Sequence, residues 1–389
     1  MATASIWQRP PRVEADIAVV GGGVIGCATA WALARQSPGL DVVVVEAERL
    51  AWGASGRNAG FLLLGTASDY ATAVETHGRE AARRIWAFTA EAYRLAADLG
   101  ARHDLGFRPT GSVIAAGDAT EADRLARSHA LLTEDVVESR LLGADAANAH
   151  LGSARFSGAL VVPEGGEIDP ARLVRALASE SGAQLVVGRR VEMIEGDGGR
   201  VRLALEGGGE VVAGRAMLAV NAWLPRLVAT LAEKVRPVRA QMLATAPLPV
   251  RLSVPVYSHA GYFYLRQRTD GRVLLGGARH LHRDAEVGYA DATTDALQQS
   301  LGAYLAEHFP AFADAPVERR WSGTMGFSPD GLPRLGAVPG VPGAWWAAGF
   351  TGHGMGYALR FGELAARTLT GDSDPASDLF AASRLPTSA

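Results

Sequence analysis

A glycine-rich turn near the N-terminus constrains the fold of this chain more than any other feature. The turn reads Gly21-x-Gly23-x-x-Gly26, with the β-forming run DIAVV before it and the alanine-rich stretch CATAWALARQ after it. A second β-forming run, DVVVVEA, follows and carries Glu46 twenty residues after Gly26. A strand, a helix and a second strand in this order form a βαβ unit, which predicts a parallel sheet buried on both faces.

The residues of this turn meet the requirements of dinucleotide binding. Gly21 permits a tight turn, Gly23 lets the backbone approach a pyrophosphate, and Gly26 allows helix and strand to pack closely. The helix N-terminus offers N–H groups to phosphate, and Glu46 accepts a hydrogen bond from a ribose hydroxyl. The pattern is common to FAD and NAD sites and does not separate them. The predicted contacts are Gly21, Gly23, Val24, Ile25, Gly26, Glu46 and Ala47.

The stretch AWGASGRNAGF, residues 51–61, combines bare backbone with side-chain donors. If Glu46 binds the adenosine ribose, the segment after it runs along the rest of the dinucleotide. Its polar side chains then donate hydrogen bonds, and its glycines let the main chain lie against phosphate and a flat ring. The alternative is a mobile polar loop. The predicted contacts are Ser55, Gly56, Arg57, Asn58, Ala59 and Gly60.

A second glycine-rich turn lies near the other end of the chain, in AAGFTGHGMGYALRFGELAA. A strand again leads into a helix, whose N-terminal dipole would stabilise negative charge on a reduced flavin ring. Two such turns are hard to explain with a nicotinamide cofactor alone. His353 fits either a flavin contact or a surface histidine that caps the helix. The predicted contacts are Gly352, His353, Gly354 and Met355.

The 389 residues exceed a comfortable single core and favour two domains. The β-rich stretch between the two glycine turns predicts an α/β chain in which a Rossmann-type dinucleotide-binding domain carries an inserted α+β substrate domain on an antiparallel-rich sheet. Residues 14–85, 150–235 and 320–389 are assigned to the first domain, and 86–149 and 236–319 to the second. Helices are expected over 77–99, 119–133, 139–150, 170–181, 291–308 and 355–370.

Charge and composition exclude several classes of partner. The net charge of −3, without any dense Lys/Arg run, predicts no nucleic-acid binding. Residues 17–34 are uncharged, but three consecutive glycines interrupt them, so they are interpreted as buried strand and helix and no integral membrane segment is expected. The single Cys27 excludes an intramolecular disulfide and suits a cytoplasmic protein.

The sequence HLHRD has the spacing of a metal site, because an extended strand would place His280, His282 and Asp284 on one side. It follows a β-rich run at an expected domain rim, and no fourth ligand is evident. No metal is therefore predicted.

At this point the sequence resembles the D-amino-acid-oxidase-like flavoproteins. These include glycine oxidase, sarcosine oxidase, D-amino-acid dehydrogenase and the γ-glutamylputrescine-oxidase-like amine oxidases. The resemblance spans residues 14–371 and rests on both glycine turns, on EIDPARLVRAL and LAVNAW, and on SPDGLPRLG. The motif GASGRN favours the γ-glutamylputrescine-oxidase-like branch. The resemblance implies an FAD-binding domain, a β-sheet substrate domain, and hydride transfer from a C–N carbon to flavin N5.

The resemblance also implies further site residues. Val191 matches a position whose backbone meets the adenine, and Asn221 and Trp223 fall where relatives line the adenosine. Tyr264 matches a tyrosine on the substrate-domain strand that faces the flavin. Tyr262 shares its face, because side chains alternate along a strand.

Three positions depart from the family pattern. Gly323 stands where some relatives tether flavin through a cysteine, and the early histidine tether is also missing, so FAD is expected to bind non-covalently. Leu274 stands where sarcosine-oxidase types carry the lysine that assists oxygen reduction. Met325 stands where glycine oxidase binds its substrate carboxylate with an arginine, which favours an amine or a differently anchored amino acid.

The sequence therefore predicts an FAD-dependent oxidase or dehydrogenase of a small-molecule amine or amino acid, with oxygen or another electron acceptor. The catalytic candidates are Tyr264, Tyr262 and Arg57, the substrate-binding candidates are Gln241 and Arg279, and Gly323 joins the cofactor contacts. The alternatives are an NAD-dependent dehydrogenase, a flavin domain acting in tRNA modification, and a flavin-binding sensor without enzymatic activity.

Overall fold

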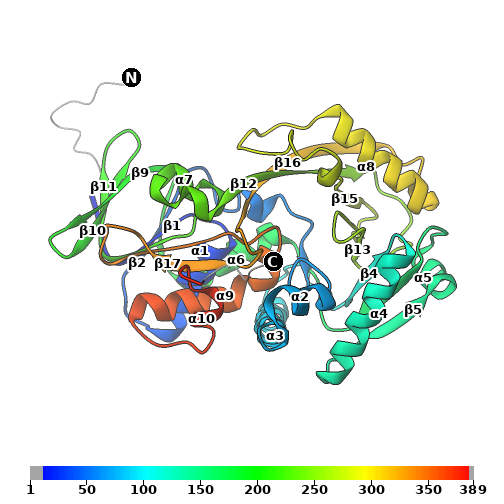
Figure 1. Ribbon diagram of the computed structural model, residues 1–389. Helices are drawn as coiled ribbons and strands as arrows, with labels where there is room; N and C mark the ends of the chain where they lie inside the picture. Colours follow the sequence, from blue (N-terminus) through cyan, green and yellow to red (C-terminus); the bar gives the residue numbers. More distant parts are fainter. Residues whose placement is uncertain (1–11, 385–389) are drawn as a thin grey trace.

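The computed structural model describes residues 12–384, which form two large sheets beside each other (Figure 1). The predicted βαβ unit is confirmed. It consists of β1 (Arg12–Val20), α1 (Val24–Gln36) and β2 (Val42–Glu46). Because β1 and β2 are parallel, their carboxyl ends bring Gly21 and Glu46 to the same edge of the sheet.

The first sheet has the strand order β17-β18-β11-β1-β2-β8, with β9 and β10 attached through β11. The run from β18 to β8 is parallel, as expected for a Rossmann-type sheet. The remaining strands are β8 (Gln184–Val187), β9 (Val191–Asp197), β10 (Arg200–Leu205), β11 (Glu210–Leu218), β17 (Arg334–Ala337) and β18 (Ala344–Ala348). Strands from the start, the middle and the end of the chain thus share one sheet.

Both faces of the first sheet are buried, and β1 illustrates this. Alternate residues of this strand point to opposite sides of the sheet, and both sides are covered. Ile17 and Val19 pack with helices, whereas Ala18 and Val20 pack with β9, β10 and the segment after β11. The helices on the first face are α3 (Arg79–Arg102), α6 (Pro170–Ser181), α9 (Gly354–Thr370) and α10 (Ser377–Phe380), together with α1. On the other face lies α7 (Leu224–Leu227), flanked by the 3-10 helices η2 (Asn221–Trp223) and η3 (Ala229–Lys234).

The second sheet has the order β16-β12-β15-β14-β13-β4-β6-β5 and is antiparallel except between β13 and β4. Its strands are β4 (Ser112–Ala116), β5 (Arg140–Gly143), β6 (Gly158–Val162), β12 (Arg236–Thr245), β13 (Val256–Ser258), β14 (Phe263–Gln267), β15 (Val273–Gly277) and β16 (Val317–Phe327). The 3-10 helices η4 (Arg279–Leu281) and η5 (Pro310–Phe312) connect its elements. The predicted fold class is thereby confirmed.

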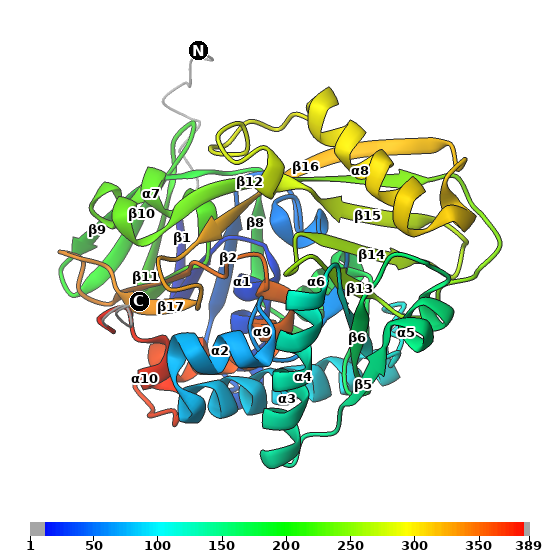
Figure 2. The same cartoon turned by 45° about the vertical axis from the view of Figure 1, so that its right-hand side comes forward.

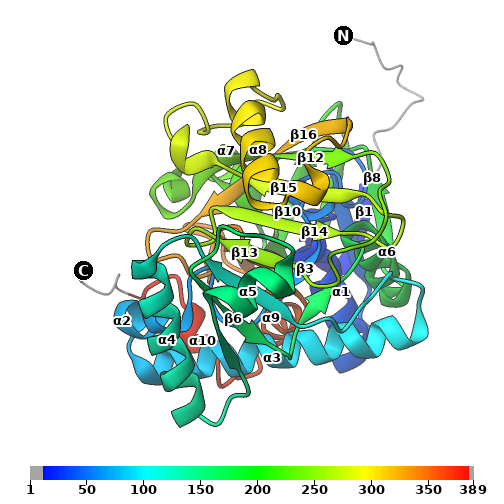
Figure 3. The same ribbon diagram turned by 90° about the vertical axis from the view of Figure 1, so that its right-hand side faces the viewer.

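The two faces of the second sheet have different partners. One face is covered by α8 (Asp295–His308) and α5 (Ala144–Leu151); Figure 3 shows α8 lying across the strands. The opposite face packs against the segment around β3 (Phe61–Leu62), which pairs with β7 (Gly166–Glu167), and against α2 (Tyr70–His77) and α4 (Ala119–Glu134). Figure 2 shows α4 beside β5 and β6 of this sheet, with α2 next to α4. The second face therefore looks toward the first sheet.

Some predicted elements were wrong in part. The helix expected over 139–150 begins as β5, and only residues 144–151 are helical. The segment Asn221–Trp223 is a 3-10 helix instead of the end of a β run, and α2 was not predicted. The domain boundaries stay a prediction; β6, from the range assigned to the first domain, pairs within the second sheet. Within residues 12–384, no helix combines the length and apolar character that a membrane crossing requires.

Candidate cofactor and substrate site

The turn between β1 and α1 is closely built. Gly21 has a φ of +112°, and a Cβ on Gly26 would collide with the Gly21 carbonyl oxygen. Glu46 Oε2 accepts a hydrogen bond of 2.7 Å from Gly22 N, and Ser55 Oγ accepts one of 2.9 Å from Val24 N. The turn itself therefore requires Gly21 and Gly26. Glu46 and Ser55 fix its conformation by accepting hydrogen bonds from its backbone.

This turn leaves donors for an anion. Gly23 is the N-cap of α1 and has no side-chain cap. Among the described residues, the N–H groups of Gly23, Ile25 and Gly26 find no protein acceptor. Unpaired N–H groups and the positive end of a helix dipole form an anion site, so this cradle fits a pyrophosphate.

Residues 51–61 connect the two sheets. At one end, Ser55 Oγ accepts a hydrogen bond from Val24 N in the first turn of α1. At the other end, Trp321 Nε1 on β16 donates to the Arg57 carbonyl oxygen at 2.8 Å, and Phe61 packs edge-on against Tyr257 and Tyr264. The segment is thus an ordered connection between the sheets, and the alternative of a mobile polar loop does not describe it.

Two polar side chains of this segment are used internally. Asn58 donates to the carbonyl oxygens of Ala54 and Ser55 and accepts from Gly60 N, so its side chain shapes the loop. Arg57 donates to Asp291 Oδ1 at 2.6 Å, and this hydrogen bond lowers the pKa of Asp291. Asp291 therefore shares the charge of Arg57, and the role predicted for Arg57 beside a flavin stays a prediction.

The second glycine turn leads into another helix whose first N–H groups are not capped by a side chain. α9 starts at Gly354, and His353 is its N-cap without capping it through the side chain. Within the described chain, the N–H groups of Gly354 and Met355 have no protein acceptor. His353 is buried, its Nε2 lies 3.2 Å from the Leu63 carbonyl oxygen, and burial lowers its pKa to about 4. His353 is therefore a neutral interior histidine; the surface alternative is wrong, and the flavin contact stays a prediction.

Both glycine-rich segments meet one face of β16. A Cβ on Gly323 would lie 3.2 Å from Arg57 Cβ, and a Cβ on Gly352 would lie 3.5 Å from Met325 Sδ. Gly323 and Met325 are two residues apart and share a face, which separates the two contacts by about 7 Å along the strand. The two glycine-rich segments, far apart in the sequence, therefore converge on one face of β16.

The residues predicted to line the adenosine are found around the face of the first sheet that carries α7. Val191 is buried at the start of β9 and packs with valines of β1 and β2. Asn221 Oδ1 accepts from Gly349 N at 3.0 Å. The ring of Trp223 packs on that of Tyr289, with centroids 4.8 Å apart. Asn221 thus joins the second glycine turn to the first sheet, and the adenosine contacts stay predictions.

An aromatic group faces this region from the second sheet. Tyr264 and Tyr257 are paired across β14 and β13, with ring centroids 6.0 Å apart, and each meets Phe61 edge-on. Neither hydroxyl has a protein partner among the described residues, and burial raises the pKa of Tyr264 to about 12. Both therefore stay protonated hydrogen-bond donors. Tyr257 was missed because it belongs to no motif; the pattern VYS in a β run was its only signal.

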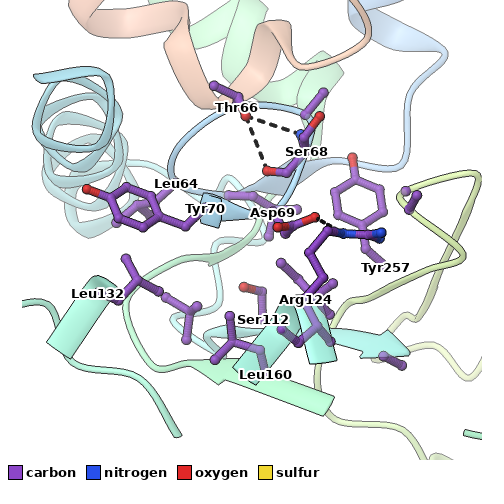
Figure 4. Close-up of a pocket in the computed structure, with 18 of the residues that line it drawn as sticks. Leu64, Thr66, Ser68, Asp69, Tyr70, Ser112, Arg124, Leu132, Leu160 and Tyr257 are labelled. Atoms are coloured by element: carbon purple, nitrogen blue, oxygen red, sulfur yellow. Dashed lines mark hydrogen bonds and ion pairs between the residues drawn. The ribbon is translucent and has the colours of Figure 1, made fainter. Parts of the chain in front are cut away.

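The structure has two cavities in this region, and Tyr257 lines the first of them. The first holds about 40 Å³ and reaches from His353 and Tyr257 toward α4, where Arg124 Nε donates to Asp69 Oδ2 at 2.7 Å (Figure 4). This is room for a few water molecules. Asp69 also accepts from Thr72 and Ser128, which satisfies it internally. The cavity is too small for a substrate.

The second cavity holds about 480 Å³ and opens beside Phe327, the last residue of β16. Arg279 and Tyr262 line it, together with Val238 and Phe327 from the sheet face that carries Met325. The Arg279 guanidinium carbon lies 5.2 Å from the centroid of Tyr262 and 4.7 Å from that of Phe327. The structure therefore places these two candidates together, in a cavity large enough for a small molecule.

Gln241 is placed elsewhere, and its predicted role in substrate binding is wrong. Its side chain is fully buried on the α8 face of the second sheet. Its Nε2 donates to Glu286 at 2.7 Å and to Thr294 at 3.0 Å, and its Oε1 accepts from Gln298. Alternation along β12 puts Gln241 and its neighbour Met242 on opposite faces, and only Met242 looks toward Tyr264.

The metal-like spacing in HLHRD does not persist in three dimensions. His282 lies 3.0 Å from Ser300 Oγ, whereas His280 packs on Tyr262. Over residues 12–384, no three His, Cys, Asp or Glu side chains gather as a metal site would need.

Comparison with known proteins gives a consistent result. The family profile described as DAO, "FAD dependent oxidoreductase", matches residues 16–368. The chain is 28% identical to gamma-glutamylputrescine oxidoreductase of Escherichia coli, over 93% of this chain and 85% of that protein. It is 31% identical to glycine oxidase of Pseudomonas aeruginosa, over 91% and 94%. The crystal structure of glycine oxidase from Geobacillus kaustophilus matches with a TM-score of 0.81 at 25% identity, covering 96% of this chain and 99% of that one.

Proposed function

The chain belongs to the family of FAD-dependent oxidoreductases, and from this membership we propose that it oxidises the C–N bond of a small amine or amino acid. The observation that carries the proposal is the convergence of the two glycine-rich segments on one face of β16, next to a cavity lined by Tyr262 and Arg279. Membership in this family favours FAD over NAD as the cofactor. With FAD, the second glycine turn has a role in binding the cofactor.

FAD is held non-covalently by backbone groups at both helix N-termini. The free N–H groups at the start of α1 would bind the pyrophosphate, and Glu46 would accept from the ribose. The free N–H groups of Gly354 and Met355 would meet the end of the ring that gains negative charge. When bound, FAD accepts hydride from the carbon next to the substrate nitrogen, and the resulting imine is hydrolysed by water.

The side chains of this chain position the substrate and exclude water. Tyr264 and Tyr257 present hydroxyl donors that have no partner within residues 12–384, and Phe61 and Leu274 complete an apolar wall. Arg279 would bind a polar end of the substrate. This division of tasks suits a hydride transfer, which depends on orientation more than on a strong base.

The electron acceptor is inferred from Leu274. This side chain is buried and apolar on the sheet face that looks toward the segment around β3, where sarcosine-oxidase types carry lysine. Without a cation at this position, the reduced enzyme should react slowly with oxygen and pass electrons to another acceptor. Reduction without oxygen followed by admission of air tests this; fast reoxidation with stoichiometric peroxide would contradict it.

Anaerobic titration tests the proposed activity. The purified protein should be yellow, and its oxidised flavin bands should bleach when a suitable amine or amino acid is added from a panel. The variant Arg279→Met should raise the half-saturating concentration while leaving the oxidised spectrum unchanged. A colourless preparation that ignores added FAD, or flavin that no amine reduces, would contradict the proposal.

A further inference from the structure

The cavity beside Phe327 has an unusual charge balance. Three arginines line it, Arg236, Arg279 and Arg283, and none of them forms an ion pair with a described residue. The two carboxylates in its wall are Glu233 and Glu286. In contrast, Arg272, the residue before β15, pairs with Glu318 at 3.0 Å.

One of the two carboxylates is already used. Glu286 is buried, and its oxygens accept from Arg239 Nε at 2.9 Å and Nη2 at 2.8 Å. Its second partner is Gln241, on the α8 face of the sheet. Of the described residues that line the cavity, only Glu233 is left to balance three guanidinium groups, so the cavity carries an excess of positive charge.

Two of the arginines are held in place by aromatic rings. Arg279 lies between Tyr262 and Phe327, and burial lowers its pKa. Arg283 Nη2 lies 3.4 Å from Tyr262 Oη. Guanidinium groups that stack on aromatic rings keep their N–H edges available, and these edges match carboxylate geometry.

The position of the cavity relates this charge to the reaction. Phe327 and Arg236 are paired on the sheet face that carries Gly323 and Met325. Phe327 lies about 7 Å beyond Met325 along the strand. A carboxylate bound by the arginines would therefore sit several bonds away from a carbon located over Gly323–Met325.

We propose that this cavity selects an amine that carries a carboxylate several bonds from the reacting nitrogen, such as an ω-amino acid. The inference rests on the proposed amine oxidation and names its substrate class. It also accounts for Met325, because an acid bound at its far end needs no arginine beside the reacting carbon. Glutarate is a non-reactive probe that presents carboxylates at the ends of a five-carbon chain, and its diamide, glutaramide, is the neutral control.

The first test is binding to the FAD-loaded enzyme, measured by calorimetry. Glutarate should bind at least tenfold more tightly than glutaramide. The double variant Arg236→Gln/Arg283→Gln should lose at least tenfold of the glutarate affinity. Arg320→Gln is the matched control, because Arg320 is exposed on β16 and lies outside the cavity; its affinity should stay within twofold. Equal binding of acid and amide, an equal loss in the control, or phosphate binding as tightly as glutarate would each overturn the inference.

The second test is kinetic, with 5-aminopentanoate and its amide as substrates. The acid should have at least a tenfold higher kcat/KM, and the double variant should raise its KM with little change in kcat and no change for the amide. If no amine reduces the flavin while glutarate still binds, the proposed oxidation fails and the anion site stands. If amines reduce the flavin without preference for the acid, the oxidation stands and this inference fails.

Discussion

Replacing Gly276 with alanine tests whether the position of the Tyr264 ring controls the reaction. The two residues are paired across β15 and β14, and the tyrosine ring covers the glycine. A Cβ on Gly276 would lie 2.5 Å from Tyr264 Cζ and 2.6 Å from its Oη. Carbon atoms in contact are about 3.5 Å apart, so the ring must move by about 1 Å.

A shift of this size should be costly for activity and tolerable for folding. Misplacing a positioning group by about 1 Å lowers the rate by about 10²-fold, or roughly 2.7 kcal/mol of transition-state stabilisation. Gly276 does not have a positive φ, so alanine is allowed by the backbone. The free energy of unfolding should fall by about 1–3 kcal/mol, as for other overpacked sites.

The assay is the rate of anaerobic flavin reduction by a substrate, measured together with urea unfolding. Gly302→Ala is the control, because Gly302 lies in α8 and a Cβ there would meet no atom within 4 Å; this variant should keep full activity and gain about 1 kcal/mol of stability. In a Tyr264→Ala background, Gly276→Ala should cost little more, since the ring it displaces is gone. A Gly276→Ala enzyme that reduces flavin within threefold of the wild-type rate would refute the reasoning.

Three further outcomes are expected. Gly26→Ala should yield protein without FAD, measured as the 450 nm absorbance per chain, because its methyl group collides with the Gly21 carbonyl; normal flavin content would contradict the proposed cradle. The pKa of His353 is lowered to about 4, so the unfolded chain binds more protons between pH 6.5 and 4, and the free energy of unfolding should fall by up to about 3 kcal/mol as the pH drops through this window. His353→Asn should lack that slope in urea titrations at several pH values. Arg239→Met should cost about 3–5 kcal/mol in urea unfolding by leaving Glu286 buried and unpaired, and adding Glu286→Leu should restore much of it; no recovery would contradict this account.

The sequence allowed the parallel sheet and its cofactor edge to be predicted, because these features depend on local pattern. The structure shows a steric reason for the glycines at 21, 23 and 26 and a hydrogen bond from Gly22 N to Glu46, whereas their contacts with a cofactor stay predictions. The helix expected over residues 355–370 is α9, which begins at Gly354, although the short α10 follows it.

Positions on the second sheet were harder to assign, because alternation tells which residues share a face but not which face meets the cofactor. Gln241 and Tyr264 both lie on strands of one sheet, yet their side chains leave it on opposite sides. That choice depends on α8 packing against one face, which is a contact between segments more than fifty residues apart in sequence.

Donor side chains in the loop after β2 illustrate a second limit. Asn58 is a hydrogen-bond donor in any conformation, but only the folded loop shows that its amide is used by Ala54 and Ser55. Arg57 likewise finds Asp291, a residue in a distant connection. The residue type indicates what a side chain is able to bind, whereas the tertiary fold decides which partner it meets.

The eleven residues from Ala51 to Phe61 touch the phosphate cradle at Ser55 and the substrate-facing sheet at Arg57 and Phe61. A change in this segment is therefore expected to affect both the binding of FAD and the binding of substrate. Variants here should shift flavin content and substrate saturation in parallel, so neither property can be tuned independently through this short stretch of chain.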